Sequence, residues 1–242
     1  MGKFVLLNTR IFGGGVDLTG NSNKVELSSE TEVKTTTAFG PDGWATVVGG
    51  LFSTALTAAG QWEALGDGAA WDNLVSRRNQ PWTICPESAA VGDLAWFTSA
   101  LAKSHKLGDQ MGEVIPWEAQ AAGTAPLLRG AVAHPPGTPR TAAGSGTALN
   151  LGPLAAGQRL YVALHVLSVA GTASPSFTAR VESDDTSAMT TPTTRSTFNA
   201  ATSPGGLVIS VPGPITDGWW RLSWLVSGTS PSFLFVASVG IA

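Results

Sequence analysis

Two stretches of alternating side chains, residues 24–34 and 51–61, constrain the fold more than any other feature of the sequence. One phase holds Val25, Leu27, Thr31, Val33, Phe52 and Leu56. The other phase is small, polar or acidic and holds Glu26, Ser28, Glu30, Glu32, Lys34, Ser53, Ala55, Thr57, Ala59 and Gln61. A period of two is typical of half-buried strands. We therefore predict two neighbouring strands, joined by residues 35–50, with one apolar face and one small, acidic face.

Composition favours a folded protein that associates with copies of itself. The chain has 242 residues, of which 43% are hydrophobic and only 13% are charged. This length holds one large all-β domain or two ordinary domains. A low-charge β protein often covers its surface with further copies, so we expect an oligomer. The net charge of −3 excludes a globally basic nucleic-acid binder.

A break in composition divides the sequence. Residues 134–139 read HPPGTP, which cannot continue a helix or a sheet, and residues 142–146 are all small. We predict a first domain at 1–133, a linker at 134–146 and a second domain at 147–242. Apolar runs in the second domain are short and bounded by turn residues, which predicts an antiparallel, jelly-roll-like β-sandwich.

Five further segments have local patterns. Residues 4–12 and 82–85 are expected to be strands, and residues 69–79 a helix with a narrow apolar stripe. The pattern of residues 94–105 fits either a helix or a strand. We favour a hairpin of two strands, residues 94–105 and 113–119.

The second half contains a repeat. GTASPSF at residues 171–177 recurs, one residue shorter, as GTSPSF at residues 228–233. Each copy lies between two apolar runs, and Gly and Pro commonly set the backbone of turns. We predict that both copies are hairpin turns.

No group of residues has the pattern of a catalytic or metal site. His105, His134 and His165 are far apart in sequence, and none belongs to a pair with metal-ligand spacing. Cys85 is the only cysteine, so it cannot form an internal disulfide. Asp184 and Asp185 lack the spacing of a calcium loop, which leaves a solvated acidic loop as the preferred interpretation. We expect neither an enzyme nor a metal or cofactor site, and no membrane span.

Longer phrases resemble one family. VDLTGNSNKVELSSETEVKTTTAFGPDGW and VVGGLFSTALTAAGQWEAL are similar to the opening of siphophage major tail (tail tube) proteins. ITDGWWRLSW and GTSPSFLFVASVGI resemble the closing strands of β-sandwiches in phage virion proteins. The resemblance implies a mainly β fold: an N-terminal β-barrel or sandwich with one flanking helix, residues 69–79, and a C-terminal sandwich.

The resemblance also implies a function and an assembly. Hexameric rings, or alternatively trimeric rings, would stack into a tube in the virion tail, after assembly in the host cytoplasm. DNA would pass through the tube during ejection, and tape measure and terminator proteins would be further partners. The lumen-facing residues would be Glu26, Ser28, Glu30, Glu32, Ser53, Thr57 and Gln61. The connection to a neighbouring ring or subunit would contain Thr36, Phe39, Asp42 and Trp44.

A second hypothesis concerns the C-terminal sandwich. It could belong to a capsid decoration protein or a tail-fibre module that binds a surface or a glycan. Trp219 and Trp220 are adjacent on an expected strand and must point to opposite faces, so they cannot form one sugar-stacking platform. We expect at least one of them to be in the core.

Overall fold

The computed structural model describes residues 7–36, 44–62, 79–108, 110 and 113–242, and almost all of its regular structure is β-strand. Its only helical element within these ranges is a 3-10 turn, η1 (Thr19–Asn21). The strands are β1 (Arg10–Gly13), β2 (Val16–Asp17), β3 (Ser22–Thr35), β4 (Val47–Gln61), β5 (Gln80–Cys85), β6 (Leu94–Leu107), β7 (Pro116–Gly123), β8 (Leu128–His134), β9 (Gly144–Ser145), β10 (Leu149–Asn150), β11 (Arg159–Asp184), β12 (Thr193–Thr197), β13 (Gly205–Pro212) and β14 (Trp219–Ile241). The expectation of a mainly β fold is confirmed. The predicted helix at 69–79 lies outside the described residues, except for its last residue.

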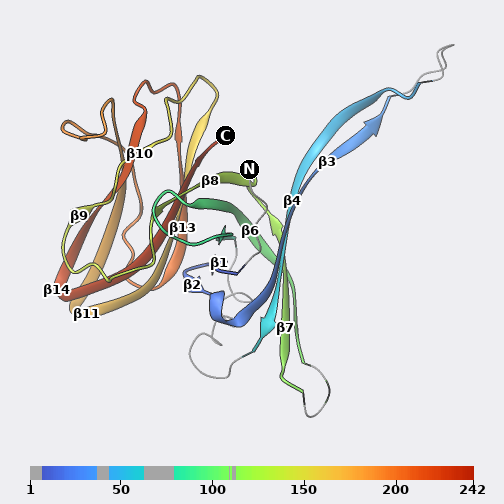
Figure 1. The fold of residues 1–242 in the computed structure, drawn as a ribbon, viewed down its shortest axis with the longest axis horizontal. Coiled ribbons are helices and arrows are strands. Elements are labelled where there is room, and N and C mark those ends of the chain that lie inside the picture. Colours follow the sequence, from blue (N-terminus) through green and yellow to red (C-terminus); the bar gives the residue numbers. More distant parts are fainter. Residues whose placement is uncertain (1–6, 37–43, 63–78, 109, 111–112) are drawn as a thin grey trace.

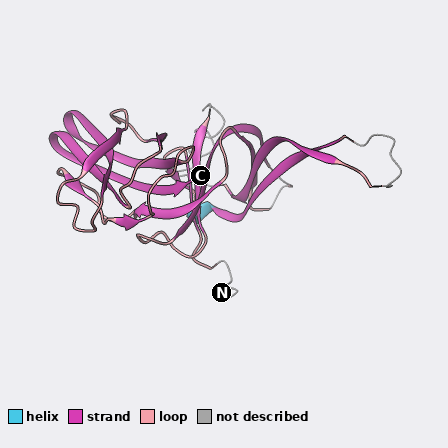
Figure 2. Ribbon diagram, turned by 90° about the horizontal axis from the view of Figure 1, so that it is seen from above, coloured by secondary structure: helices cyan, strands magenta, loops and turns pink. Residues whose placement is uncertain are grey.

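All strand pairs are antiparallel and belong to one hydrogen-bonded network that does not close into a barrel. Its main path runs β12-β11-β14-β8-β6-β5-β1-β2, while β3, β4 and β7 form a branch that joins at β6. Figure 1 shows the consequence for shape: a two-layered sandwich lies at one end of the molecule, and the β3–β4 hairpin projects at the other. Figure 2 shows the same separation from above.

The sandwich is built from two long strands that bend together. β11 and β14 pair along almost their whole length, from Leu160↔Ile241 to Asp184↔Trp219. The two repeats predicted as hairpin turns lie opposite each other at the bend, where Thr172 pairs with Thr229. That prediction is wrong, because the chain does not reverse there but passes from one layer into the other. Gly171 and Gly228 provide positive φ angles of 127° and 113° at this bend.

Aromatic side chains fill the space between the two layers. Phe177, from one layer, lies 4.6 Å in ring-centroid distance from Phe235 of the other, and Trp224 lies 5.4 Å from the same ring. Trp220 is buried in this core as well, which confirms the expectation that one of the two adjacent tryptophans is internal. Burial of these aromatic rings provides much of the apolar surface that holds the two layers together.

The N-terminal half has a separate core. Ile11, Trp82 and Ile84 of β1 and β5 pack beneath Leu56 of β4 and Trp117 of β7. The predicted strand at 82–85 is confirmed as β5, and the strand alternative for 94–105 is confirmed as β6. β7 begins at Pro116 rather than at residue 113, and β1 begins at Arg10.

The predicted domain limits stay a prediction, although two strands bear on them. β8 ends at His134 and pairs with β6 on one side and β14 on the other, so it is continuous with both halves. β9, at residues 144–145, pairs with β14. No helix of the described residues has the length and apolar character that a membrane crossing requires.

Candidate functional site: an open sheet face and a projecting arm

β3 and β4 form the predicted strand pair, with the predicted phase. Val25 pairs with Ala58 and Leu27 with Leu56, and this side packs on the N-terminal core. Glu26 pairs with Thr57 on the opposite side, which faces solvent. The alternation of the sequence therefore corresponds to one covered face and one open face.

The open face is wider than the two strands that the sequence singled out. β7 pairs with β4, and residues 100–107 of β6 pair with β7, giving a four-stranded unit that we call the open sheet. In this register Thr57 lies beside Gln120 and Ser104, and Ala59 lies beside Glu118 and Lys106. Sequence reasoning missed Ser104, Lys106, Glu118, Gln120 and Ala122, although the alternation of Trp117, Ala119 and Ala121 with polar neighbours in β7 carried the signal.

The open face is less acidic than expected, because lysines lie beside its carboxylates. Lys24 lies 3.8 Å from Glu26, and Lys34 forms an ion pair with Glu32. Across strands, Lys106 is in register with Glu118. Glu30 has no ion-pair partner within the described ranges. The face is thus polar and close to neutral rather than a continuous acidic wall.

The outer half of the β3–β4 hairpin extends beyond the core, and we call residues 29–35 and 47–53 the arm (Figure 1). Its side chains are largely exposed, with Phe52 at 83% and Leu51 at 79%. The strands are longer than predicted, since Thr36 N–H still donates to the Thr46 carbonyl at 2.8 Å. Of the four predicted connection residues, Thr36 and Trp44 lie at the end of the arm, and Phe39 and Asp42 lie outside the described residues.

Both edges of the open sheet are unpaired in the described chain. β3 pairs only with β4 on one side. Beyond Ala102, β6 pairs only with β7, because β5 and β8 pair with its first half. Unpaired edges of this kind are templates for strands of another chain.

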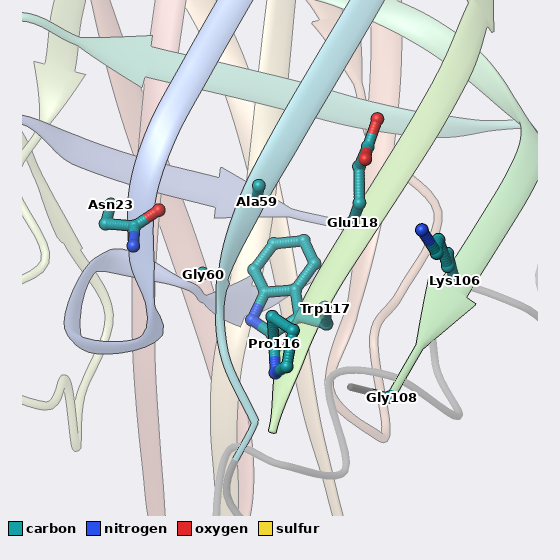
Figure 3. Close-up of a pocket in the computed structure, with 8 residues that line it drawn as sticks. All are labelled: Asn23, Ala59, Gly60, Lys106, Gly108, Pro116, Trp117 and Glu118. Atoms are coloured by element: carbon teal, nitrogen blue, oxygen red, sulfur yellow. The ribbon is translucent and has the colours of Figure 1, made fainter. Parts of the chain in front are cut away.

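A cleft of about 250 Å³ lies at the end of the open sheet opposite the arm. Figure 3 shows the side chains around it, which come from all four strands or the residues next to them. They are Asn23, Ala59, Gly60, Lys106, Gly108, Pro116, Trp117 and Glu118. Trp117 is held in place by a hydrogen bond from its indole N–H to the Asn21 carbonyl at 3.1 Å. Ala59 presents only a methyl group to the cleft, and Gly60 lies so close to the Asn21 backbone that an added Cβ would clash with the Asn21 carbonyl.

Two of the histidines considered as candidates in the sequence, His165 and His134, are buried in the core. His165 is fully buried, and burial lowers its pKa to about 3, as expected for a satisfied core histidine. His134 is also buried, and its pKa is lowered to about 4 by desolvation and by Arg140. Within the described residues no cluster of three or more histidine, cysteine or acidic side chains is placed to hold a metal ion.

Asp184, the last residue of β11, and the adjacent Asp185 do not form an open cation site. The carboxyl group of Asp185 and the backbone N–H groups of Thr186 and Thr191 hydrogen bond to Asp184, and they lower its pKa to about 2. The Asp184 oxygens therefore accept hydrogen bonds that shape the turn after β11. The interpretation of residues 184–185 as a solvated acidic loop is therefore wrong for Asp184, which is buried in β11, whereas Asp185 is exposed.

No protein-family model and no curated protein match the sequence. Several solved structures do match this chain, at low sequence identity. A virion protein of a native gene transfer agent particle is 14% identical with a TM-score of 0.40, covering 50% of this chain and 93% of its own. A protein of the anti-feeding prophage baseplate is 14% identical with a TM-score of 0.40, and the match covers 53% of this chain and 97% of that protein. SPP1 Dit is 13% identical with a TM-score of 0.37, and the match covers 97% of this chain and 99% of that protein. It is described as a paradigm of the hub adsorption apparatus in phages that infect Gram-positive bacteria. At such identities and TM-scores these are likenesses that carry no conclusion about function.

Proposed function

We propose that this chain is a structural subunit of a long non-contractile phage tail, and that copies join through the edges of their open sheets to form a ring. The observation that carries the proposal is the open sheet itself: one face packs on the core, the other is open, and both edges lack a partner. Edge-to-edge pairing of β3 with β6 of the next copy satisfies the backbone groups of both strands. A cyclic arrangement of copies leaves no edge exposed.

The open face then lines the channel. Its inner surface consists of Glu26, Ser28, Glu30, Glu32, Ser53, Thr57 and Gln61, together with Ser104, Glu118 and Gln120 of the two additional strands. Small uncharged side chains and lysines that lie beside carboxylates offer DNA few free cations. Each phosphate neutralised by a protein cation adds affinity through counterion release, which would slow DNA in transit. A nearly neutral lumen therefore suits passive conduction.

The width of the sheet in each copy supports a ring of six copies over a ring of three. Four strands from each subunit give a wide channel in a hexamer and a much narrower one in a trimer, because barrel diameter grows with strand number. We propose the hexamer. Other tail proteins, such as tape measure and terminator proteins, would contact the lumen and the end of the tube.

Electron microscopy of the purified protein tests the proposal. Negative stain should reveal six-fold rings or hollow tubes, whereas stable monomers that coat capsids or bind cell-wall sugars would contradict it. A second measurement tests the lumen. Thr57→Cys should react with a bulky maleimide in monomers and be protected in tubes, and Thr172→Cys on the sandwich should react in both. Burial raises the pKa of Cys85 to about 12, so the native thiol contributes no background.

A further inference from the structure

We propose that the outer side of the C-terminal sandwich binds an acidic oligosaccharide, in which one sugar ring stacks on Trp219 and an acidic group is held by Arg180. We call this surface the distal face. It is the outward side of the layer that contains β12, residues 176–184 of β11 and residues 219–227 of β14, with β9 and β10 at its edge. The inference goes beyond the proposed function, because it adds a binding activity that neither the ring nor the channel needs.

The distal face lies on the side of the sandwich away from the N-terminal half. The other layer packs its outer side on that half, where Val236 is buried in a cluster with Phe12. Ala163 of the same layer is likewise buried with Phe97. The layer of the distal face turns its inner side to the sandwich core, which contains Leu222. Its outward side is therefore the outermost surface of the sandwich, and a ligand there leaves the open sheet and its edges free.

Antiparallel register arranges the side chains of the distal face in rows across the strands. The rows are Asn150, Trp219 and Asp184; Arg221 and Glu182; and Ser145, Ser223, Arg180 and Thr197. Residues between them along the strands, such as Val181 and Leu222, are buried in the core, which fixes the outward direction of the rows. At a rise of about 3.3 Å per residue, the stretch from Trp219 to Ser223 covers about 13 Å. A ligand that reaches both ends is therefore a chain of several units.

Arg180 is a cation without a counter-ion. It has no ion-pair partner within the described ranges, although it is half-buried. The carboxylate two residues along the strand is already engaged, since Glu182 accepts hydrogen bonds from Arg221 at 2.8 Å and from Ser223 at 2.6 Å. A partly desolvated guanidinium gains most from a carboxylate or phosphate, which accepts its paired N–H groups. The charge at this end of the distal face therefore favours an anionic ligand.

The ion pair of Glu182 and Arg221 gives the middle of the distal face a fixed arrangement. The two side chains are only 12% and 19% exposed. Their contact uses Nε of Arg221, which leaves the N–H groups of the terminal nitrogens to donate to ligand hydroxyl groups. The middle of the distal face thus has hydrogen-bond donors that are held in place before a ligand arrives.

Trp219 supplies the apolar contact at the other end. It is half-buried, while its neighbour Trp220 lies in the sandwich core. Adjacent strand residues point to opposite sides, so Trp219 acts as a single ring rather than as part of a pair. An indole ring combines an apolar surface with a polar N–H group, which suits the CH groups and hydroxyl groups of a sugar ring.

Other classes of ligand fit the distal face less well. The centre of a protein interface is poor in charge and rich in apolar side chains, whereas Leu225, at the margin, is the one large hydrophobic residue of the described distal face that is well exposed. Nucleic acid requires several cations along its phosphates, and here Arg180 stands close to the carboxylates of Glu182 and Asp184. A sugar chain with an acidic group matches the aromatic ring, the fixed donors and the single free cation together.

Isothermal titration calorimetry with short oligogalacturonate tests the proposal. The wild type should bind oligogalacturonate, and it should bind neither uncharged dextran oligosaccharides nor polyglutamate. Arg180→Gln should weaken the affinity about tenfold or more, because a hydrogen-bonded charge pair is lost. Arg180→Lys keeps the charge and should weaken the affinity less. Trp219→Ala should weaken it as well, without a change in its dependence on salt.

Two variants of the N-terminal half are the matched controls. Arg129→Gln removes an exposed arginine that also has no ion-pair partner in the described chain, and it should bind like the wild type. Trp96→Ala replaces another half-buried tryptophan and should also bind like the wild type. Urea unfolding of every variant shows that the protein used in the titration is folded.

Several results would overturn the inference. Absence of oligogalacturonate binding by the wild type would do so, as would unchanged affinity in folded Arg180→Gln. Equal binding of polyglutamate would show that charge alone is recognised, and equal binding of dextran oligosaccharides would show that the acidic group is not recognised. Rings or tubes that bind no oligogalacturonate would refute this inference and leave the proposed function intact, whereas binding by a protein that never forms rings would do the reverse.

Discussion

His165 of β11 lies with its Nε2 atom 2.9 Å from the hydroxyl of Thr83 in β5, and this contact ties the C-terminal sandwich to the N-terminal half. The Gly15 N–H donates to the other ring nitrogen, Nδ1, at 3.4 Å. Since Nδ1 accepts, the proton of the neutral ring is on Nε2 and is donated to Thr83. Neither His165 nor Thr83 is exposed to solvent. The neutral imidazole is thus built into the joint between the halves.

Acid should loosen this joint. Burial lowers the pKa of His165 to about 3 from its usual 6.5, so the unfolded chain binds a proton between these values that the folded chain does not. The free energy of unfolding is therefore unaffected by this group above pH 6.5 and falls as the pH drops toward 3, with a limiting slope of about 1.4 kcal/mol per pH unit.

Urea unfolding at pH 7.5, 6, 5 and 4, at constant protein concentration, measures that slope. His165→Gln cannot titrate, so its slope should be smaller by about one proton. Part of the slope should remain, because the pKa of buried His134 is also lowered. An identical pH dependence in wild type and variant would show that His165 is not the titrating group.

Removing the hydroxyl partner should weaken the same joint at neutral pH. Thr83→Val keeps the shape of the side chain but leaves the buried Nε2–H of His165 without an acceptor. An unsatisfied buried donor costs about 1–3 kcal/mol, and the free energy of unfolding at pH 7.5 should fall by that amount. Thr178→Val, at a half-buried threonine of β11, should change it by less than about 0.5 kcal/mol. Equal effects of the two variants would argue against the contact.

The bend in the sandwich should depend on its two glycines. A Cβ added at Gly171 would lie 2.9 Å from Cα of Pro231, and one at Gly228 would lie 2.9 Å from Cα of Pro175. Both positions also have positive φ angles, which side chains other than glycine adopt with strain. Gly171→Ala and Gly228→Ala should each lower the free energy of unfolding by about 1–3 kcal/mol.

Thermal or urea unfolding of these variants needs a glycine control. Gly137→Ala serves, since no atom lies within 4 Å of its added Cβ. The control should be as stable as the wild type. If Gly171→Ala were as stable as the wild type, the bend would tolerate a side chain at this position. The close approach of Pro231 to Gly171 would then be contradicted.

The local patterns predicted the β3–β4 pair of the open sheet, because each of these two strands has one buried face. Val25 and Leu56 alternate with polar neighbours, and that information is contained within each strand. What the sequence did not reveal was where the cover ends: the alternation continues through Thr31 and Val33 although nothing packs on them in the described chain. Whether another element packs on a strand depends on residues far away in the sequence. The arm could therefore be recognised only in the structure.

The repeats were misread for a similar reason. Gly171 and Pro175 indicate a change in chain direction, but a reversal and a bend between two layers use the same residues. The choice depends on the partner strand, and the partner of Thr172 is Thr229, far along the chain. Likewise, the alternation of Trp117 with Glu118 predicts a strand but not that it pairs with β4.

Reversing one charge on the open face should make the channel hold DNA. Glu30→Lys breaks no ion pair of the described residues and adds a cation to the open face of every subunit. Repeated around a ring and along a tube, these cations would neutralise phosphates and release counterions. Assembled Glu30→Lys protein should therefore retain DNA at low salt in a mobility-shift assay and lose it steeply as salt rises.

Glu87→Lys, at an exposed position in the turn after β5, adds the same charge away from the open face and should retain DNA no better than wild type. Equal retention by both variants would place Glu30 outside the channel.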